Sequence, residues 1–119
     1  MKVVIRTDAS AVIGSGHVIR CLCLADALHA RGASVSFVSQ TMPQHLMQAI
    51  VARGHRVVAL PDGDARNEAL DARQTLAVCG PCDWIVVDHY GLGSDWETIV
   101  GSAARVLAID DLARPHACD

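Results

Sequence analysis

Aromatic side chains are scarce in this sequence of 119 residues, at 3%, and lysine and arginine form no run. The 10 basic and 13 acidic residues give a mild formal net charge of -3. Proteins that bind nucleic acid usually present a clustered basic face, often with aromatic rings on which bases stack. The composition therefore argues against a nucleic-acid partner.

Long hydrophobic runs are also missing. No apolar stretch approaches the roughly 18 residues that a membrane span needs, and the opening segment Met1–Ile5 breaks at Arg6 without the form of a signal peptide. These absences predict a cytoplasmic protein with no membrane span. In that compartment the five cysteines are not expected to form a disulfide framework.

About half of the residues are apolar and only 19% are charged, which suits one domain with one core. Short apolar runs rich in branched residues alternate with segments whose apolar residues recur at helical spacing. We expect strands over residues 3–5, 35–38, 56–60, 84–87 and 106–109. We expect helices over residues 17–31, 46–53, 67–78 and 94–104, the last of them opened by a capping box of Ser94 and Glu97.

This alternation predicts an α/β fold. Near-continuous apolar strands are typical of a parallel sheet that is covered on both faces. We therefore expect a doubly wound, Rossmann-like sheet of about five strands in the order 3-2-1-4-5. Residues 1–119 contain no repeat and no internal domain boundary, so they are read as a single domain.

Ligands of such sheets bind beyond the carboxyl ends of the strands, where the strand order reverses. Polar residues follow the first, fourth and fifth expected strands. They are Arg6, Thr7, Asp8, Ser10, Asp88, His89, Tyr90, Asp110 and Asp111. The first and fourth strands should be neighbours, so these side chains are expected to converge on one crevice.

The segment Gly14-Ser15-Gly16-His17 joins the first strand to the first helix. Gly14 and Gly16 permit a tight turn and the close approach of a ligand. The helix start offers unpaired N–H groups and a partial positive charge, which disfavours a charged His17 and favours a neutral ring that can accept a proton. The alternative is a glycine turn whose histidine only caps or packs.

The same turn is not a dinucleotide or P-loop motif. Ile19 stands where the third glycine of G-x-G-x-x-G would be, and no P-loop lysine follows. The histidines show no H-x-x-x-H spacing, so we predict neither a cofactor nor a metal. Arg20, one turn into the helix, either faces the crevice and a phosphate or is an ordinary solvated residue.

The segment Asp88-His89-Tyr90-Gly91 ends a buried strand, where it either takes part in the chemistry or merely caps the loop. Asp8 or Asp88 is expected to orient the ring of His17 or a sugar hydroxyl, and the residue types do not choose between them. Asp110 and Asp111 could hold a ligand hydroxyl, a metal or the turn that follows.

Two groups of residues are expected to lie outside the chemistry. Cys79-Gly80-Pro81-Cys82 has the C-x-x-C form of a redox motif. A redox pair should open a helix, however, and this one closes a helical stretch with ordinary Gly-Pro turn residues. We also expect His29, His45 and His55 at the surface or at edges.

Three blocks of the chain together resemble one known family. They are residues 6–22, with RTDAS, IGSGH and RCL; residues 84–91, WIVVDHYG; and residues 109–119. Their combination and order are similar to those of the UDP-2,4-diacetamido-2,4,6-trideoxy-β-L-altropyranose hydrolases of pseudaminic-acid biosynthesis. Related polysaccharide-biosynthesis proteins share this domain.

The resemblance implies a GT-B fold, in which the active site lies between two Rossmann-like domains. Residues 1–119 would then be the N-terminal domain, and a C-terminal nucleotide-binding domain would follow Asp119 and hold most of the UDP. It implies metal-independent removal of UDP from C1 of a diacetamido-trideoxy hexose, with His17 as the base that activates water. The isolated domain is expected to have little or no activity.

We accordingly predict two sets of site residues. The catalytic set is His17, Asp8 and Asp88, and the substrate-binding set is Gly14, Ser15, Gly16, Arg20, His89, Tyr90 and Asp111. Two alternatives remain open. One is a GT-B glycosyltransferase domain, whose acceptor is a sugar or lipid hydroxyl, and the other is a non-catalytic module that binds sugar nucleotides.

Overall fold

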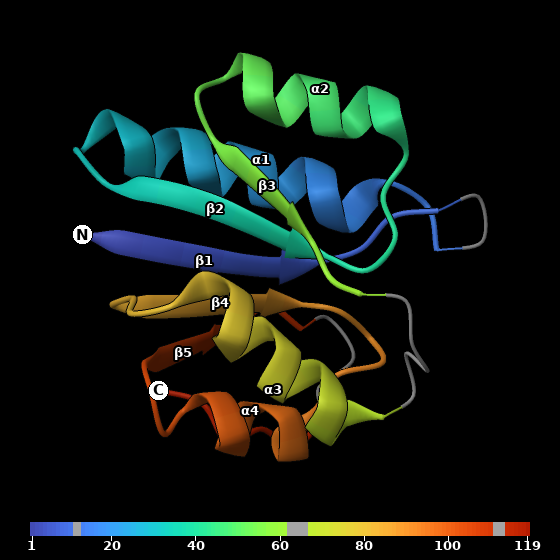
Figure 1. Ribbon diagram of the computed structural model, residues 1–119, viewed down its shortest axis with the longest axis vertical. Helices are drawn as coiled ribbons and strands as arrows, with labels where there is room; N and C mark the ends of the chain where they lie inside the picture. Colours follow the sequence, from blue (N-terminus) through green and yellow to red (C-terminus); the bar gives the residue numbers. More distant parts are fainter. Residues whose placement is uncertain (11–12, 62–66, 111–113) are drawn as a thin grey trace.

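A computed structural model describes residues 1–10, 13–61, 67–110 and 114–119 of the chain. A five-stranded parallel sheet lies at its centre, in the order β3-β2-β1-β4-β5, with helices on both faces (Figure 1). The strands are β1 (Lys2–Thr7), β2 (Ser34–Ser39), β3 (Arg56–Ala59), β4 (Trp84–Asp88) and β5 (Arg105–Ala108). The helices are α1 (Gly16–Ala30), α2 (Gln44–Ala52), α3 (Glu68–Cys79) and α4 (Ser94–Val100). The predicted Rossmann-like fold class and strand order are confirmed.

The core has two layers, one on each face of the sheet. Successive side chains of a strand point to opposite faces, so Val3 and Ile5 of β1 pack with α1 and α2, whereas Val4 packs with α3 and α4. The central strands are therefore buried on both faces. This double burial explains why they form continuous apolar runs in the sequence.

The start of α4 differs from the predicted capping box. The helix begins at Ser94 after Gly93, without a side-chain cap in the described structure, and it ends at Val100 rather than near residue 104. Glu97 does not turn back to the helix start. Its buried carboxylate accepts the backbone N–H of Ala117 at 2.7 Å and contacts the ring of His116 at 2.6 Å. A contact with the end of the chain thus replaces the local cap.

His55 was expected at the surface or at an edge; it directly precedes the edge strand β3, but it is not at the surface. Only 3% of the residue is exposed. Its Nε2 lies 2.9 Å from Oδ1 of Asp26, and its ring meets the ring of His29 edge-on, with the centroids 5.4 Å apart. The carboxylate of α1 gives the buried ring a polar partner, which the sequence pattern does not reveal.

The cysteine pair lies where the sequence places it. Cys79 is the last residue of α3, and Cys82 follows in the turn before β4. Both are free thiols, and burial, followed by the neighbouring Cys79, raises the pKa of Cys82 to about 11. A high pKa keeps the thiolate scarce near neutral pH, and Cys79 ends α3 rather than opening a helix, whose start would lower the pKa.

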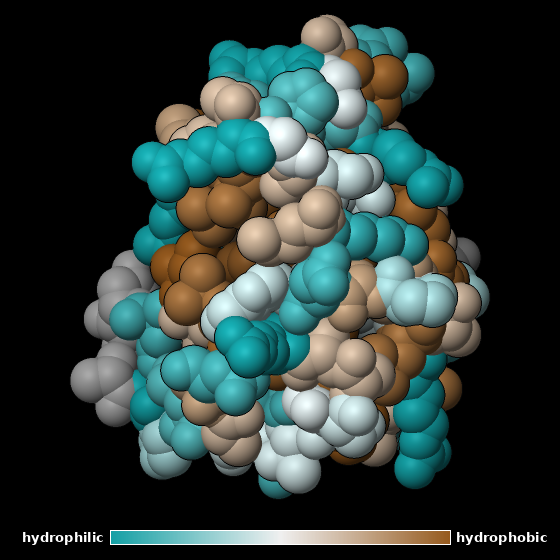
Figure 2. Space-filling view, turned by 90° about the vertical axis from the view of Figure 1, so that its left-hand side faces the viewer, coloured by the Kyte–Doolittle hydropathy of each residue, from teal (hydrophilic) through white to brown (hydrophobic). Residues whose placement is uncertain are grey.

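One part of the sheet, near the start of β4, is less well covered. A groove of about 260 Å³ is lined by apolar side chains of the N-terminus, α1, β4 and β5, among them Met1, Leu24, Leu28, Trp84 and Leu107. Figure 2 shows hydrophobic residues gathered into a patch on this side of the molecule. Within the described ranges, no helix combines the length and the apolar character needed to cross a membrane.

Candidate functional site

The candidate site lies where the strand order reverses, between the carboxyl ends of β1 and β4. Thr7 at the end of β1 is in register with Asp88 at the end of β4. A cavity of about 410 Å³ opens beyond them. Its lining residues are Asp8, Ile13, His17, Asp88, His89, Tyr90 and Gly91. A smaller hollow of about 280 Å³ shares three of these residues and reaches the start of α1 at Gly16 and Arg20.

The glycine turn brings α1 to this cavity. Gly14 has a φ of +84°, a left-handed conformation that favours glycine, and its N–H donates to the carbonyl of Ser10 at 2.7 Å. Ser15 precedes α1 but forms no side-chain cap in the described structure, and the first helical turn has no acidic residue. The positive end of α1 is therefore not neutralised by its own first turn.

His17, the second residue of α1, is held by Asp88. Its Nδ1 lies 2.5 Å from Oδ1 of the carboxylate, and only 8% of the residue is exposed. A carboxylate can only accept, so Nδ1 must carry the proton and donate it to Asp88. In the neutral ring Nε2 then bears the lone pair, and no side chain of the described residues binds it. His17 therefore presents a ring nitrogen that can accept a proton.

Arg20 holds Asp88 from the other side. Its Nε donates to Oδ2 and its Nη2 to Oδ1, both at 2.5 Å. Burial raises the pKa of Asp88, but the hydrogen bonds from Arg20 and then His17 outweigh it and leave the pKa below its usual range. Asp88 is thus a buried, fixed anion. The guanidinium of Arg20, which was predicted to bind the substrate, is engaged with this carboxylate.

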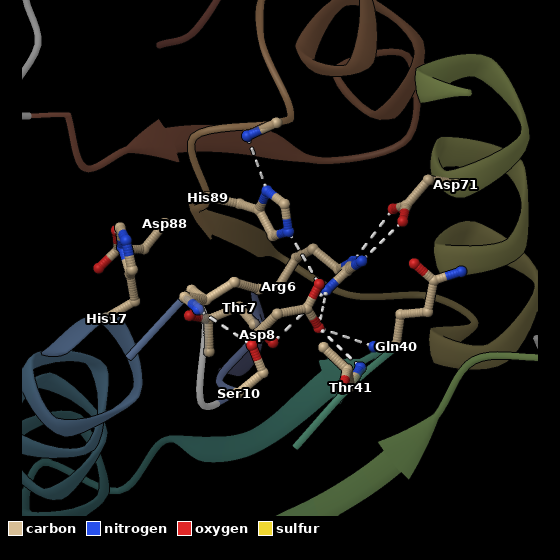
Figure 3. A network of polar contacts seen from close by, with 12 residues as sticks. Arg6, Thr7, Asp8, Ser10, His17, Gln40, Thr41, Asp71, Asp88 and His89 are labelled. Carbon is tan, nitrogen blue, oxygen red and sulfur yellow. Dashed lines mark hydrogen bonds and ion pairs between the residues drawn. The ribbon is translucent and has the colours of Figure 1, made fainter. Parts of the chain in front are cut away.

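A second histidine–aspartate pair lies nearby, because Asp8 after β1 contacts His89 from the loop after β4 (Figure 3). Nε2 of His89 lies 2.8 Å from Oδ2 of Asp8, and the N–H of Gly91 donates to Nδ1 at 2.9 Å. Nδ1 accepts, so Nε2 carries the proton and donates it to Asp8. Both ring nitrogens of His89 are therefore occupied, in contrast to those of His17.

Asp8 belongs to a buried network that fastens β1 to its surroundings. It accepts hydrogen bonds from the backbone N–H groups of Gln40 and Thr41, at 2.8 and 3.2 Å, and from Nη1 of Arg6 at 2.8 Å. Burial raises the pKa of Asp8, but the hydrogen bonds from His89 and Arg6 reverse the shift and hold the pKa well below its usual range. Asp8 is therefore ionised and has no role in proton uptake near neutral pH.

The other end of this network is Asp71 of α3, which the sequence did not single out. Arg6 is fully buried and donates to both carboxylate oxygens of Asp71, at 3.0 and 2.6 Å (Figure 3). The indole Nε1 of Trp96 donates to the same carboxylate at 2.8 Å. The one available signal was the arginine itself, since a guanidinium at the end of a buried strand requires carboxylate partners.

Tyr90 closes the cavity on the side of His17. The two rings meet edge-on, with their centroids 4.5 Å apart and an interplanar angle of 81°. Tyr90 remains 47% exposed, so it can also contact a ligand. In the part of the chain that the structure describes, no three His, Cys, Asp or Glu side chains converge as a metal ion would require.

The structure places most of the predicted site residues and shows which of them contact one another. His17 is paired with Asp88 and not with Asp8, which answers the question left open by the sequence. Asp110 contacts the backbone N–H of Arg114 at 2.9 Å and Nε2 of His116 at 2.6 Å. Asp111 lies outside the described residues, so its predicted contact with substrate remains a prediction.

Fold and site together define a Rossmann-like α/β domain with a cavity, lined partly by histidine and aspartate side chains, at the point where the strand order reverses. No protein-family model matches the chain. Among solved structures, a substituted short-chain dehydrogenase/reductase of Serratia marcescens aligns with a TM-score of 0.56 and 16% identity, over 93% of this chain and 55% of that one. A likeness at this level of identity concerns the fold alone.

In sequence, the chain is 29% identical over 121 residues to the UDP-2,4-diacetamido-2,4,6-trideoxy-beta-L-altropyranose hydrolase of Campylobacter jejuni. The match takes in the whole chain and 40% of that protein, so the chain spans less than half the length of its curated relative. This similarity supports the family resemblance that the three sequence blocks indicate.

Proposed function

We propose that the chain is the N-terminal catalytic part of a nucleotide-sugar hydrolase, which removes UDP from C1 of a diacetamido-trideoxy hexose. The observation that carries this proposal is the His17–Asp88 pair beside a cavity. The ring is held through Nδ1, and Nε2 is left to take a proton. The similarity to a UDP-sugar hydrolase supports the substrate class.

In the proposed reaction, Nε2 of His17 removes a proton from a water molecule as the water oxygen attacks C1. The bond between C1 and the diphosphate oxygen breaks, and UDP leaves with the electron pair. The imidazolium that forms is stabilised by the buried Asp88 carboxylate, which also keeps the ring in the required tautomer. Arg20 holds that carboxylate in place through two hydrogen bonds.

The remaining residues of the site are proposed to bind the substrate. The uncapped start of α1 at Gly14–Gly16 suits negative charge on the leaving group, and the exposed ring of Tyr90 suits contact with the sugar. The cavity of about 410 Å³ has the size of a small-molecule site. We propose that the uridine is held mainly by a second Rossmann-like domain in a GT-B arrangement.

It follows that residues 1–119 alone should turn over little or no substrate. The working environment would be the cytoplasm, where UDP-sugars for polysaccharide and pseudaminic-acid biosynthesis are handled. Rapid turnover of the UDP-sugar by the isolated chain would refute the proposal that a second domain is needed to hold the uridine. Calorimetry with the UDP-sugar would identify a module that binds without catalysis.

The decisive test is His17→Asn in the full-length protein. We expect kcat to fall by about 10²–10⁴-fold, the usual contribution of a positioned general base, with a smaller change in KM. His45→Asn is a matched control, because His45 is exposed on α2, outside the cavity. Equal kcat values for the two variants would eliminate His17 as the base. Product analysis with and without a sugar acceptor separates hydrolysis from glycosyl transfer.

A further inference from the structure

The turn after β4 places Tyr90 next to His17, and a backbone hydrogen bond from the N–H of Leu92 to the carbonyl of His89, at 3.3 Å, closes it. We call residues 89–91 the Tyr90 turn. It lies at the edge of the cavity, with Tyr90 and Gly91 both exposed. Two side chains also bind the backbone of this turn, one at an N–H group and one at its carbonyls.

The first of these is His89, within the turn itself. Its Nδ1 accepts the N–H of Gly91, while its Nε2 is anchored on Asp8. The ring lies so close to the backbone that a Cβ at Gly91 would meet its Cε1 at 3.0 Å and its Nδ1 at 3.2 Å. Glycine thus lets the ring fasten the N–H side of the turn to β1.

The second is Arg114, from the segment after β5. Its Nη1 donates to the carbonyl of Tyr90 at 2.6 Å, and its Nη2 donates to the carbonyl of His89 at 3.3 Å. The guanidinium therefore holds the two carbonyls of the turn at once. A fork of donors with fixed geometry can do this, whereas the single ammonium of a lysine cannot do it in the same way.

Arg114 is itself anchored on the body of the domain. Its backbone N–H donates to Oδ2 of Asp110 at 2.9 Å, and its Nε lies 3.4 Å from the same oxygen. His116 links that carboxylate to the fully buried Glu97 of α4, with a contact of 2.6 Å on each ring nitrogen. A continuous series of contacts therefore connects Glu97 of α4, through His116, Asp110 and Arg114, to the Tyr90 turn.

We propose that Arg114 is a positioning residue of the candidate site, which holds the Tyr90 ring against His17 by fixing the carbonyls of the Tyr90 turn. The effect on turnover rests on the proposed function. The effect on geometry does not, because it concerns only the arrangement of two rings.

The geometric part can be measured by NMR on the labelled chain. Tyr90 is the single tyrosine of the sequence, so its ring signals are easily assigned. We expect nuclear Overhauser effects between the rings of Tyr90 and His17, and their loss in Arg114→Gln and Arg114→Lys. Arg105→Gln is the matched control, because Arg105 lies over the ring of Trp84, outside the lining of the cavity.

The catalytic part is measured in the full-length protein. Arg114→Gln should lower kcat by about 10–100-fold, the range expected when a reacting group is displaced by an ångström or less. Arg105→Gln should leave kcat unchanged. Arg114→Lys retains the charge and the aliphatic stem, so it separates loss of the fork from loss of a cation.

The outcomes distinguish this proposal from the proposed function. Folded Arg114 variants that keep the contact between the two rings would overturn the positioning role. Variants that unfold, with melting temperatures far below that of Arg105→Gln, would overturn it as well, because Arg114 would then support the whole domain. Loss of the contact in a protein that does not hydrolyse UDP-sugars would refute the proposed function alone.

Discussion

The substitution Asp88→Asn tests the central pair most directly, because it exchanges one carboxylate oxygen for an amide group of the same size. Oδ1 accepts from His17 and Arg20, and Oδ2 accepts from Arg20. An NH₂ group at the Oδ2 position would point its hydrogens at those of Arg20. At the Oδ1 position it would force His17 to accept at Nδ1 and carry its proton on Nε2.

With the NH₂ group at the Oδ1 position, Nε of Arg20 can still donate to the remaining oxygen, but Nε2 of His17 carries a proton and cannot act as the base. We therefore expect kcat to fall by about 10²–10⁴-fold, which is the contribution of a general base and corresponds to about 3–5 kcal/mol in the activation barrier. The carboxylate of Asp88 is fully buried and engaged by His17 and Arg20, so we expect KM to change less than kcat. Steady-state assays of UDP release would measure both constants, and ¹⁵N spectra of the His17 ring would report its tautomer.

Asp26→Asn provides the matched control. Asp26 also contacts one histidine and one arginine, His55 and Arg53, but it belongs to the middle of α1 and does not line the cavity. The same chemical change there should leave kcat and the His17 tautomer unaltered. If Asp88→Asn has the same kcat as Asp26→Asn, or if its His17 ring keeps the proton on Nδ1, the reasoning is refuted.

Two further predictions concern stability. Arg6→Met leaves two buried carboxylates without their shared cation, so we expect the free energy of unfolding in urea to fall by about 3–5 kcal/mol. The control is Arg53→Met, because the side chain of Arg53 is 54% exposed. A loss for Arg6→Met that is no larger than the loss for Arg53→Met would contradict the prediction. The pKa of His116 is raised by its hydrogen bonds to Glu97 and then Asp110, so its stabilising effect is complete below the usual value of 6.5 and is lost as the pH rises through the raised value. In His116→Gln the unfolding free energy should therefore decrease less steeply above pH 6.5. An unchanged pH profile in calorimetric unfolding would contradict a stabilising role for the contacts of His116 with Glu97 and Asp110.

The fold was largely predictable because its signals are local and repeated. Branched apolar runs mark strands that are buried on both faces, and the rules for crossover connections leave few possible strand orders. The capping box of α4 was predicted wrongly for the opposite reason. The capping pattern of Ser94 and Glu97 is local, whereas the carboxylate of Glu97 is used by His116, which comes much later in the chain.

The sequence predicted which residues of the site lie close together, but not which of them contact one another. Parallel strands end at one edge, so Asp8 and Asp88 had to lie near His17, but strand spacing does not determine which carboxylate the ring meets. Asp71 and Arg114 were missed because their partners at the site, Arg6 for Asp71 and the carbonyls of His89 and Tyr90 for Arg114, are remote in the chain.

The sequence separation within the two histidine–aspartate pairs, His17–Asp88 and Asp8–His89, has a consequence for how the domain folds. The partners are 71 and 81 positions apart in the sequence, and each pair joins the first strand–helix unit to β4 or its loop. Contacts of such high separation form slowly, because long stretches of chain must be ordered before they can close. A chain emerging from the ribosome therefore contains His17 and Asp8 long before either has its partner. The contact between His17 and Tyr90 should accordingly be among the last to appear during refolding, and it provides a natural reporter of the completed sheet.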